Sequence, residues 1–214
     1  RRQRQMCIRD RFKSSSDGYY KITEYVNGLF DMESNDIRGL NYTYNADGYI
    51  WKYLGVDKTT ARAASENDQN YIIYRLADVL LMKAEALIMQ GHNEDAADLI
   101  DRTRERAGLG ETTLSDDRMV MLETLLVERQ KEFFGEGKNW FDLLRIGLRS
   151  EQLNDTQYKT LFVEQALKAV GASRQSLGRA TLANSGSWYL PYSEDELSKN
   201  PLLEQSDYYQ SISN

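Results

Sequence analysis

The chain is organised around one run, VERQKEFFGEGKNWFDLLR, which spans Val127–Arg145. In its first half, acidic and basic side chains are interleaved with Phe133 and Phe134. Gly135 and Gly137 then interrupt the helical pattern, and an apolar run restarts directly after them. Two helices that meet at a tight turn, which glycine permits, produce such a pattern. We therefore predict a joint between two helices, with aromatic side chains in the angle and charges that are paired or solvated.

The carboxylates of this run permit two interpretations, a glycosidase site and a structural ion-pair network. Glu128 and Glu132 are four residues apart on a helix, close enough for the paired carboxylates of a glycosidase. However, Arg129 and Lys131 lie among them, and cations oppose the raised pKa that a general acid needs. We therefore predict no catalytic residue. The predicted structural joint consists of Arg75, Glu85, Glu128, Arg129, Glu132, Gly137, Trp140, Asp142 and Arg145.

The segment before this run predicts a helical hairpin. Apolar residues cover more than half the circumference over Tyr71–Gln90, which is typical of a helix between other helices. Glu94–Ala107 is amphipathic, with Gly91 ending the first helix and Asn93 capping the second. Antiparallel helices joined by so few residues form an αα-hairpin like one tetratricopeptide unit, which needs further helices as partners.

Two more helices are predicted around the joint. Ser115–Phe134, capped by Ser115 or Asp116, is the third, and Asn139–Leu148 is the fourth. Trp140 is expected to be a core side chain, so that Trp140→Ala would cost about 3–5 kcal/mol by leaving a cavity.

The C-terminal part has weaker patterns. We predict a helix in Tyr158–Val170 and an extended segment at Ser187–Pro191. Ser193 and Glu196 form a capping box that opens one helical turn, and Pro201 stops it. The aromatic side chains expected to pack against the helices are Trp188, Tyr189 and Tyr192.

The N-terminal region is rich in aromatic side chains and turn residues. Phe12–Lys58 contains seven tyrosines and several Asp-Gly or Asn-Gly pairs, which predicts short strands and loops. Tyrosine and tryptophan in loops can stack their flat faces on sugar rings, although packing onto the helical body is the commoner role. The candidate ligand contacts are Tyr42, Tyr44, Tyr49 and Trp51.

Residues 1–11, RRQRQMCIRDR, look foreign to the protein. Reverse-translated codon by codon, they resemble a transposon-end adapter used in preparing sequencing libraries; a basic arm for nucleic acid or membrane is the alternative. We therefore expect the true N-terminus to lie upstream of a genuine region, 12–214. Within it, 12–70 is predicted to be rich in strands and loops, 71–150 to be a helical body, and 151–214 to contain a helix, a loop and an extended C-terminal tail.

The composition argues against several classes of function. Residues 1–11 hold five Arg and one Asp, a net of +4, so the rest of the chain has a formal charge of −10 instead of −6. An acidic chain without a dense basic patch is a poor candidate for nucleic acid. Cys7 is the single cysteine and His92 the single histidine, which argues against thiol chemistry and a zinc site. We predict no metal, no cofactor and no enzymatic activity.

Three runs, in order, resemble the SusD/RagB family of outer-membrane nutrient-binding proteins. The central run is similar to the family pattern E-R-x-x-E-L-x-x-E-G-x-R-W-F-D-L-x-R, except that Asn139 stands where a basic residue is usual. The matching runs are Tyr74–Met82 with Ala84–Ala86, Glu128–Arg145, and Trp188–Pro191 through Asn200 and Pro201 to Tyr208 and Tyr209.

The resemblance implies a mainly α fold with tetratricopeptide-like hairpins, as in the C-terminal part of a SusD-like protein. It further implies non-catalytic capture of a glycan or other nutrient at the cell surface, and delivery to a SusC-type TonB-dependent transporter in the outer membrane. An N-terminal lipid anchor is expected upstream of this sequence, and the closing Tyr208 and Tyr209 are expected to be near a natural C-terminus. The alternative is a helical-hairpin scaffold that binds only protein.

Overall fold

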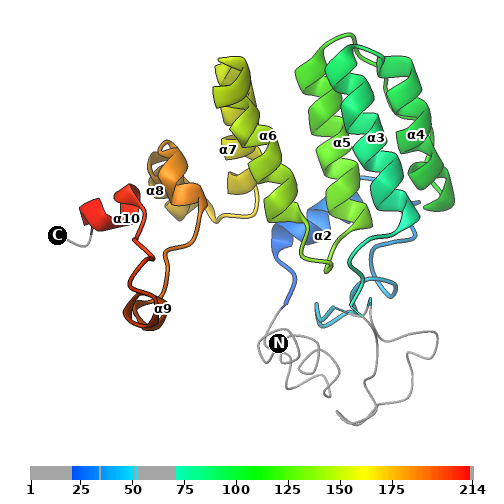
Figure 1. The fold of residues 1–214 in the computed structure, drawn as a ribbon. Coiled ribbons are helices and arrows are strands. Elements are labelled where there is room, and N and C mark those ends of the chain that lie inside the picture. The colour runs from blue at the N-terminus through cyan, green and yellow to red at the C-terminus, as the bar shows by residue number, and fades with distance from the viewer. Residues whose placement is uncertain (1–20, 34, 51, 53–70, 213–214) are drawn as a thin grey trace. The chain divides into compact units, whose positions relative to one another are not determined.

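The computed structural model describes residues 21–33, 35–50, 52 and 71–212, and helices dominate this part of the chain (Figure 1). The predicted mainly α architecture is therefore confirmed. Two compact units meet in the chain between Asp142 and Leu143. The helices are α2 Glu24–Asp31, α3 Leu76–Gln90, α4 Asn93–Arg106, α5 Arg118–Glu132, α6 Asn139–Leu153, α7 Thr156–Leu167, α8 Ala172–Leu182, the 3-10 helix η3 Ser185–Trp188, α9 Glu194–Lys199 and α10 Asp207–Ile212.

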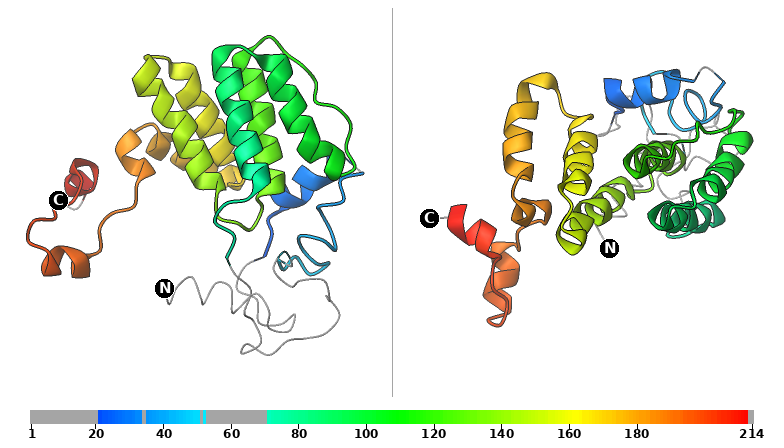
Figure 2. Two further views of the ribbon diagram at one scale, coloured as in Figure 1. Left: turned by 45° about the vertical axis from the view of Figure 1, so that its right-hand side comes forward. Right: turned by 90° about the horizontal axis from the view of Figure 1, so that it is seen from above.

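In the first unit, α3, α4 and α5 lie side by side, as Figures 1 and 2 show. Gly91 ends α3 in the left-handed conformation, with φ +82°, and this sharp turn allows α4 to fold back as predicted. Fully buried side chains of the three helices, including Leu81, Ile100 and Leu125, form the core of this hairpin and its third helix. No helix of the described residues is long and apolar enough to cross a membrane.

Helix α2 was not predicted. It crosses the C-terminal end of α5, where the Tyr25 hydroxyl donates to Gln130 Oε1 at 2.6 Å (Figure 1). Thr23 caps it by accepting from Val26 N, and Phe30 is buried within it. The Asn-Gly pair inside α2 was interpreted as a turn signal, but burial of one apolar face outweighs the helix cost of a single glycine. In the described part of 21–50, β-structure consists of isolated bridges.

Several predicted helix boundaries are wrong. Helix α3 begins at Leu76 and not at Tyr71, because the backbone of Arg75 is extended. The side chains of Tyr71 and Arg75 bind backbone oxygens in the turn after α5 and at the end of α5. His92, not Asn93, is the N-cap of α4, since the Asn93 side chain donates instead to Ser115 O at 2.9 Å.

Other boundary errors concern α5, α6 and α8. Asp117 caps α5 by accepting from Met119 N at 2.7 Å, in place of the predicted Ser115 or Asp116. Helix α6 continues to Leu153, and α8 lies in a stretch where no helix was predicted.

The second unit packs around an aromatic pair. The rings of Phe162 in α7 and Trp188 in η3 lie 4.4 Å apart, and Trp188 Nε1 donates to Leu182 O at 2.9 Å. Gly147 of α6 lies against both rings: a Cβ placed on it would lie 3.0 Å from Phe162 Cγ and 3.1 Å from Trp188 Cζ3. The expected packing of the C-terminal aromatics is confirmed for Trp188 but wrong for Tyr189 and Tyr192, which are about half exposed.

Candidate functional site

Three carboxylates follow one side of α5 and the turn after it. Glu128 and Glu132 lie in α5, Glu136 lies in the turn, and each residue is at most 3 % exposed. A spacing of four residues on a helix directs side chains to one face, which explains why they gather there. Buried carboxylates need charged or hydrogen-bonded partners, and the loop before α3 and the segment 33–52 supply them.

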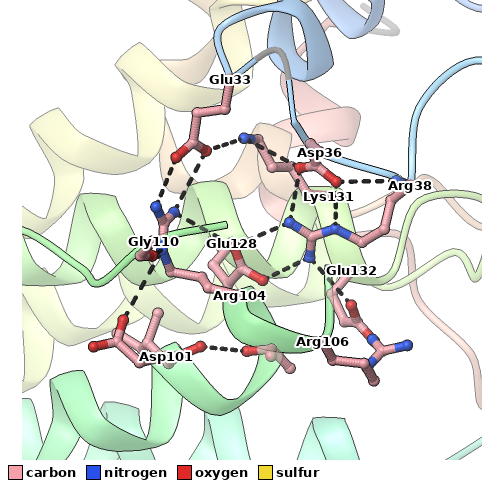
Figure 3. A network of polar contacts seen from close by, with 12 residues as sticks. Glu33, Asp36, Arg38, Asp101, Arg104, Arg106, Gly110, Glu128, Lys131 and Glu132 are labelled. Atoms are coloured by element: carbon pink, nitrogen blue, oxygen red, sulfur yellow. Dashed lines mark hydrogen bonds and ion pairs between the residues drawn. The ribbon is translucent and has the colours of Figure 1, made fainter. Parts of the chain in front are cut away.

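Arg38 binds the first two carboxylates at once (Figure 3). Its Nη1 lies 2.6 Å from Glu128 Oε1 and 3.2 Å from Glu132 Oε2. Asp36 accepts from Arg38 Nε and Nη2, both at 2.9 Å, and so fixes the guanidinium plane. A guanidinium can satisfy several carboxylates because its donors are arranged as a planar fork.

The network continues from Asp36 through Lys131 to Glu33. Lys131 Nζ lies 2.6 Å from Glu33 Oε2 and 3.5 Å from Asp36 Oδ2. Glu33 also accepts from Arg104 Nη2 of α4 at 2.6 Å, so positive and negative groups alternate through this part of the network (Figure 3).

Arg75 and Lys52 bind the carboxylates at the end of α5 and in the turn after it. Arg75 pairs with Glu132 and with Glu136, and its Nη2 also donates to the backbone oxygen of Glu132 at 2.7 Å. Lys52 Nζ lies 2.5 Å from Glu136 Oε1 and donates to Glu132 O at 2.6 Å.

A separate group of four charges joins the starts of α3 and α6 to α5. Arg129 donates to both oxygens of Asp142 at 2.8 Å and to Asp78 Oδ1 at 2.8 Å. Lys138 also pairs with Asp78. Arg129 Nη1 is buried without a hydrogen-bond partner among the described residues.

Phe133 lies close to cations of both groups. The guanidinium carbons of Arg75 and Arg129 lie 4.6 and 4.8 Å from its ring centre, and Lys138 Nζ lies 5.3 Å away. Cations are attracted to the face of an aromatic ring, and this attraction strengthens when water is excluded.

The surroundings shift the pKa values of the carboxylates in opposite directions. Burial alone raises the pKa of Glu132, but hydrogen bonds from Arg75 and the charges of Arg75, Arg106 and Arg38 outweigh it and lower the pKa. In Asp78, the bonds from Lys138 and Arg129 likewise outweigh burial, and the pKa is lowered. Burial dominates at Glu128, whose pKa is raised despite its bond to Arg38.

This arrangement suits a structural role. Each carboxylate described above is held by at least one cation. A substrate could therefore exchange a proton with it only by displacing an ion pair. Among the described residues, no group of His, Cys, Asp and Glu could hold a metal ion. The ion pairs fix loops and helices to α5.

The structure brings together most of the predicted joint. Arg75 pairs with Glu132 and Arg129 pairs with Asp142, whereas Glu128 pairs with Arg38 from outside the predicted set. Gly137 makes the predicted turn with φ +74°. Glu85 is 4 % exposed and buried in α3, while Arg145 lies in the second unit.

The prediction that Trp140 is a core side chain is wrong. Trp140 is 39 % exposed and Phe141 is 67 % exposed, whereas Phe133 is 3 % exposed. Phe133 is thus the buried aromatic side chain of the joint, with the guanidinium groups of Arg75 and Arg129 close to its ring.

The aromatic candidates for ligand contacts have different environments. Tyr44 is 2 % exposed, its hydroxyl donates to Asn27 Oδ1 at 3.0 Å and its ring lies 5.9 Å from that of Phe30. It therefore packs the loop and cannot stack on a ligand. Tyr42 is 58 % exposed, Tyr49 is half-buried under Lys21 Nζ at 4.8 Å, and Trp51 lies outside the described residues.

Several members of the network were not predicted from the sequence: Glu33, Asp36, Arg38, Lys52, Asp78, Arg104, Arg106 and Lys138. Lys138 had a usable signal, because it precedes Asn139, the position where the resembling pattern has a basic residue. Arg38 had none, since 90 residues separate it from Glu128.

Comparison with known proteins gives consistent matches. A model of the SusD family matches residues 8–209. SusD-like protein P38 of Formosa agariphila is 37 % identical over 89 residues, which are 38 % of this chain and 18 % of the relative. SusD-like protein P25 of the same organism is 29 % identical over 171 residues, which are 78 % of this chain and 28 % of the relative.

Solved structures agree in fold. A SusD superfamily protein from Bacteroides fragilis matches with a TM-score of 0.64 at 26 % identity, over 92 % of this chain and 42 % of that one. One from Bacteroides vulgatus matches with a TM-score of 0.58 at 23 % identity, over 92 % and 47 %, and supports the fold alone. The chain thus spans less than half the length of these relatives.

Proposed function

We propose that this chain, which belongs to the SusD family, forms part of a non-catalytic cell-surface protein that captures a glycan or another nutrient polymer. The match over residues 8–209 carries this proposal. The whole protein would pass its ligand to a SusC-type TonB-dependent transporter in the outer membrane. A lipid anchor upstream of this sequence would hold it there.

The ion-pair network supports a binding role over hydrolysis. An inverting or retaining glycosidase needs one carboxylic acid that can give its proton to the leaving group. Glu128 has a raised pKa, but it is 1 % exposed and bound to Arg38, so a glycan could not reach it.

Binding would use the exposed aromatic side chains of the loop 39–50. Tyr42 offers an exposed ring, and Tyr49 offers part of one. Stacking of such rings on sugars, together with hydrogen bonds from the hydroxyl groups, needs no proton transfer.

Calorimetric titration tests the proposal. This chain, and the open reading frame that contains it in the source DNA, would be titrated with soluble starch, xylan, a β-1,3-glucan and alginate. We expect saturable heat with at least one polymer, weakened by Tyr42→Ala and unchanged by Tyr189→Ala, an exposed tyrosine of the second unit. Absence of heat with every polymer would favour the protein-only scaffold, and release of reducing ends that Glu132→Gln abolishes would favour an enzyme.

Co-purification tests the partner. The open reading frame would be expressed with the TonB-dependent transporter encoded beside it and extracted in mild detergent. We expect the two proteins to elute together. Separate elution at physiological salt would contradict delivery to that transporter.

A further inference from the structure

The loop that carries Tyr42 and Tyr49 has its two ends fixed to the same face of α5. Arg38 precedes the loop and Lys52 follows it, and both side chains end on the carboxylates Glu128, Glu132 and Glu136. We propose that Arg38 and Lys52 are positioning residues, a two-point ionic clamp that holds the loop Gly39–Ile50 in one arrangement on α5 and thereby orders its exposed tyrosines for ligand.

Arg38, the first point of the clamp, is held by several hydrogen bonds. The Arg38 guanidinium donates to Asp36, Glu128 and Glu132, and its side chain is 10 % exposed. Its backbone oxygen accepts from the Thr43 hydroxyl inside the loop, so the position of Arg38 is transmitted to the first turn of the loop.

The second point combines charge with close packing. Lys52 Nζ bonds to Glu136 and to the backbone oxygen of Glu132, and its side chain is 19 % exposed. Next to it, a Cβ on Gly135, which has φ +79°, would lie 3.3 Å from Ile50 Cγ2. The glycine turn after α5 thus lets the end of the loop approach closely.

The loop also contacts the segment around α2. Ile22 N donates to Gly48 O at 2.9 Å, and Tyr44 donates to Asn27 and packs on Phe30. Backbone bonds inside the loop, such as Asn45 N to Tyr49 O at 2.9 Å, close its turns but do not attach it to α5. The described polar contacts that attach the loop to α5 and the turn after it are those of Arg38 and Lys52, so their loss should loosen the loop on α5.

Arg106 provides a matched control. It also pairs with Glu132, but it belongs to α4 and its side chain is 60 % exposed. Arg106→Met therefore removes one cation from the same carboxylate without touching the loop. Arg38→Met alone would leave the buried Glu128 with only Arg104, at 4.0 Å, so the double variant Arg38→Met/Glu128→Gln removes both charges and guards against misfolding.

The first readout is amide hydrogen exchange of the full chain by mass spectrometry. We expect Lys52→Met and Arg38→Met/Glu128→Gln to speed exchange in residues 39–50 by about 5- to 30-fold, as loss of one or two kcal/mol of local stability does. Exchange in α3 and α4 should stay within about twofold, Arg106→Met should leave the loop unchanged, and Lys52→Arg should restore protection. Unchanged exchange in residues 39–50 in both charge-removing variants would overturn the proposal.

The second readout is affinity, and only this part rests on the proposed function. With whichever of the four polymers binds, we expect the two charge-removing variants to weaken binding about 5- to 30-fold, measured at a temperature well below the thermal midpoint of each variant. Faster exchange with unchanged affinity would overturn the assignment of Arg38 and Lys52 as positioning residues for ligand. If the parent chain binds none of the polymers, the proposed function fails, while the exchange data still decide whether the clamp exists.

Discussion

Different interactions stabilise the interior of each of the two units of this chain. The first unit buries charged side chains, among them Asp78, Glu128, Arg129 and Glu136, and pairs them across segments far apart in the sequence. The second unit buries Tyr158, Phe162 and Trp188, and its described ion pairs, such as Glu164 with Arg179, are about half exposed.

This difference predicts how each unit tolerates change. A buried charge that loses its partner retains the full cost of its desolvation, so the first unit should be sensitive to removal of one charge. An apolar core is sensitive to volume instead, and exposed ion pairs contribute little. The following changes test this difference between the two units, in order of decreasing expected effect.

Arg129→Met should have the largest effect. It leaves Asp142 without the bidentate partner shown in the structure and Asp78 with Lys138 alone. We expect a loss of about 3–5 kcal/mol in the free energy of unfolding, measured by urea denaturation. The matched control, Arg179→Met, removes an arginine from an exposed pair of the second unit and should leave the urea midpoint unchanged. Equal losses in both variants would remove the contrast.

Gly147→Ala should destabilise the second unit by about 1–3 kcal/mol, because the added methyl group meets a packed aromatic pair. Its Cβ would lie within 3.2 Å of Phe162 and Trp188. In a helix that lacked such neighbours, the same change would stabilise by roughly 1 kcal/mol. Gly178→Ala is less informative, since its Cβ meets the flexible end of Leu167. A rise in thermal midpoint of Gly147→Ala would show that this pair is not packed as described.

Trp140→Ala should cost about 1–2 kcal/mol, less than the 3–5 kcal/mol predicted from the sequence, because more than a third of the side chain is already in water. Phe133→Ala, at the centre of the same joint, should cost more. Urea denaturation of both variants gives the order directly, and a larger loss for Trp140→Ala would restore the sequence-based interpretation of the joint.

Lowering the pH should change the contributions of two neighbouring carboxylates of α5 to stability in opposite directions. The folded-state pKa of Glu132 is lowered, so its ionised form stabilises the fold above its unfolded pKa, and this contribution is lost as pH falls through the folded pKa. The folded-state pKa of Glu128 is raised, so its ionised form destabilises the fold at neutral pH, and protonation relieves this cost as pH falls through that raised pKa.

Glutamine mimics the protonated form at each position. At pH 7, Glu132→Gln should therefore be less stable than the parent and Glu128→Gln more stable, since Arg38 keeps Asp36 and Glu132 as partners. Both differences should shrink as the pH is lowered through the respective folded pKa. Urea midpoints from pH 7 to acid measure them, and differences of the same sign at pH 7 would contradict the opposite shifts.

The sequence predicted α3, α4 and α5 of the first unit and the ionic character of the joint, but neither α2 nor the partners that complete the joint. The spacing of Glu128 and Glu132 and the glycines after them are local signals that survive in the structure. Lys131 finds Glu33 across 98 residues, and such pairing depends on the path of the chain, which periodicity does not encode. Trp140 was misplaced because the start of its helix could be predicted, but not which aromatic side chain of the joint is buried: Phe133 is, among cations, and Trp140 is 39 % exposed.

A double-mutant cycle between Arg129 and Asp142 tests most directly that paired buried charge holds the first unit together. The free energies of unfolding of Arg129→Met, Asp142→Asn and the double variant would be compared with that of the parent. We expect a coupling energy of about 2–3 kcal/mol, with the double variant more stable than the sum of the single losses predicts. Additive losses, with a coupling energy near zero, would contradict a structural role for the buried charges.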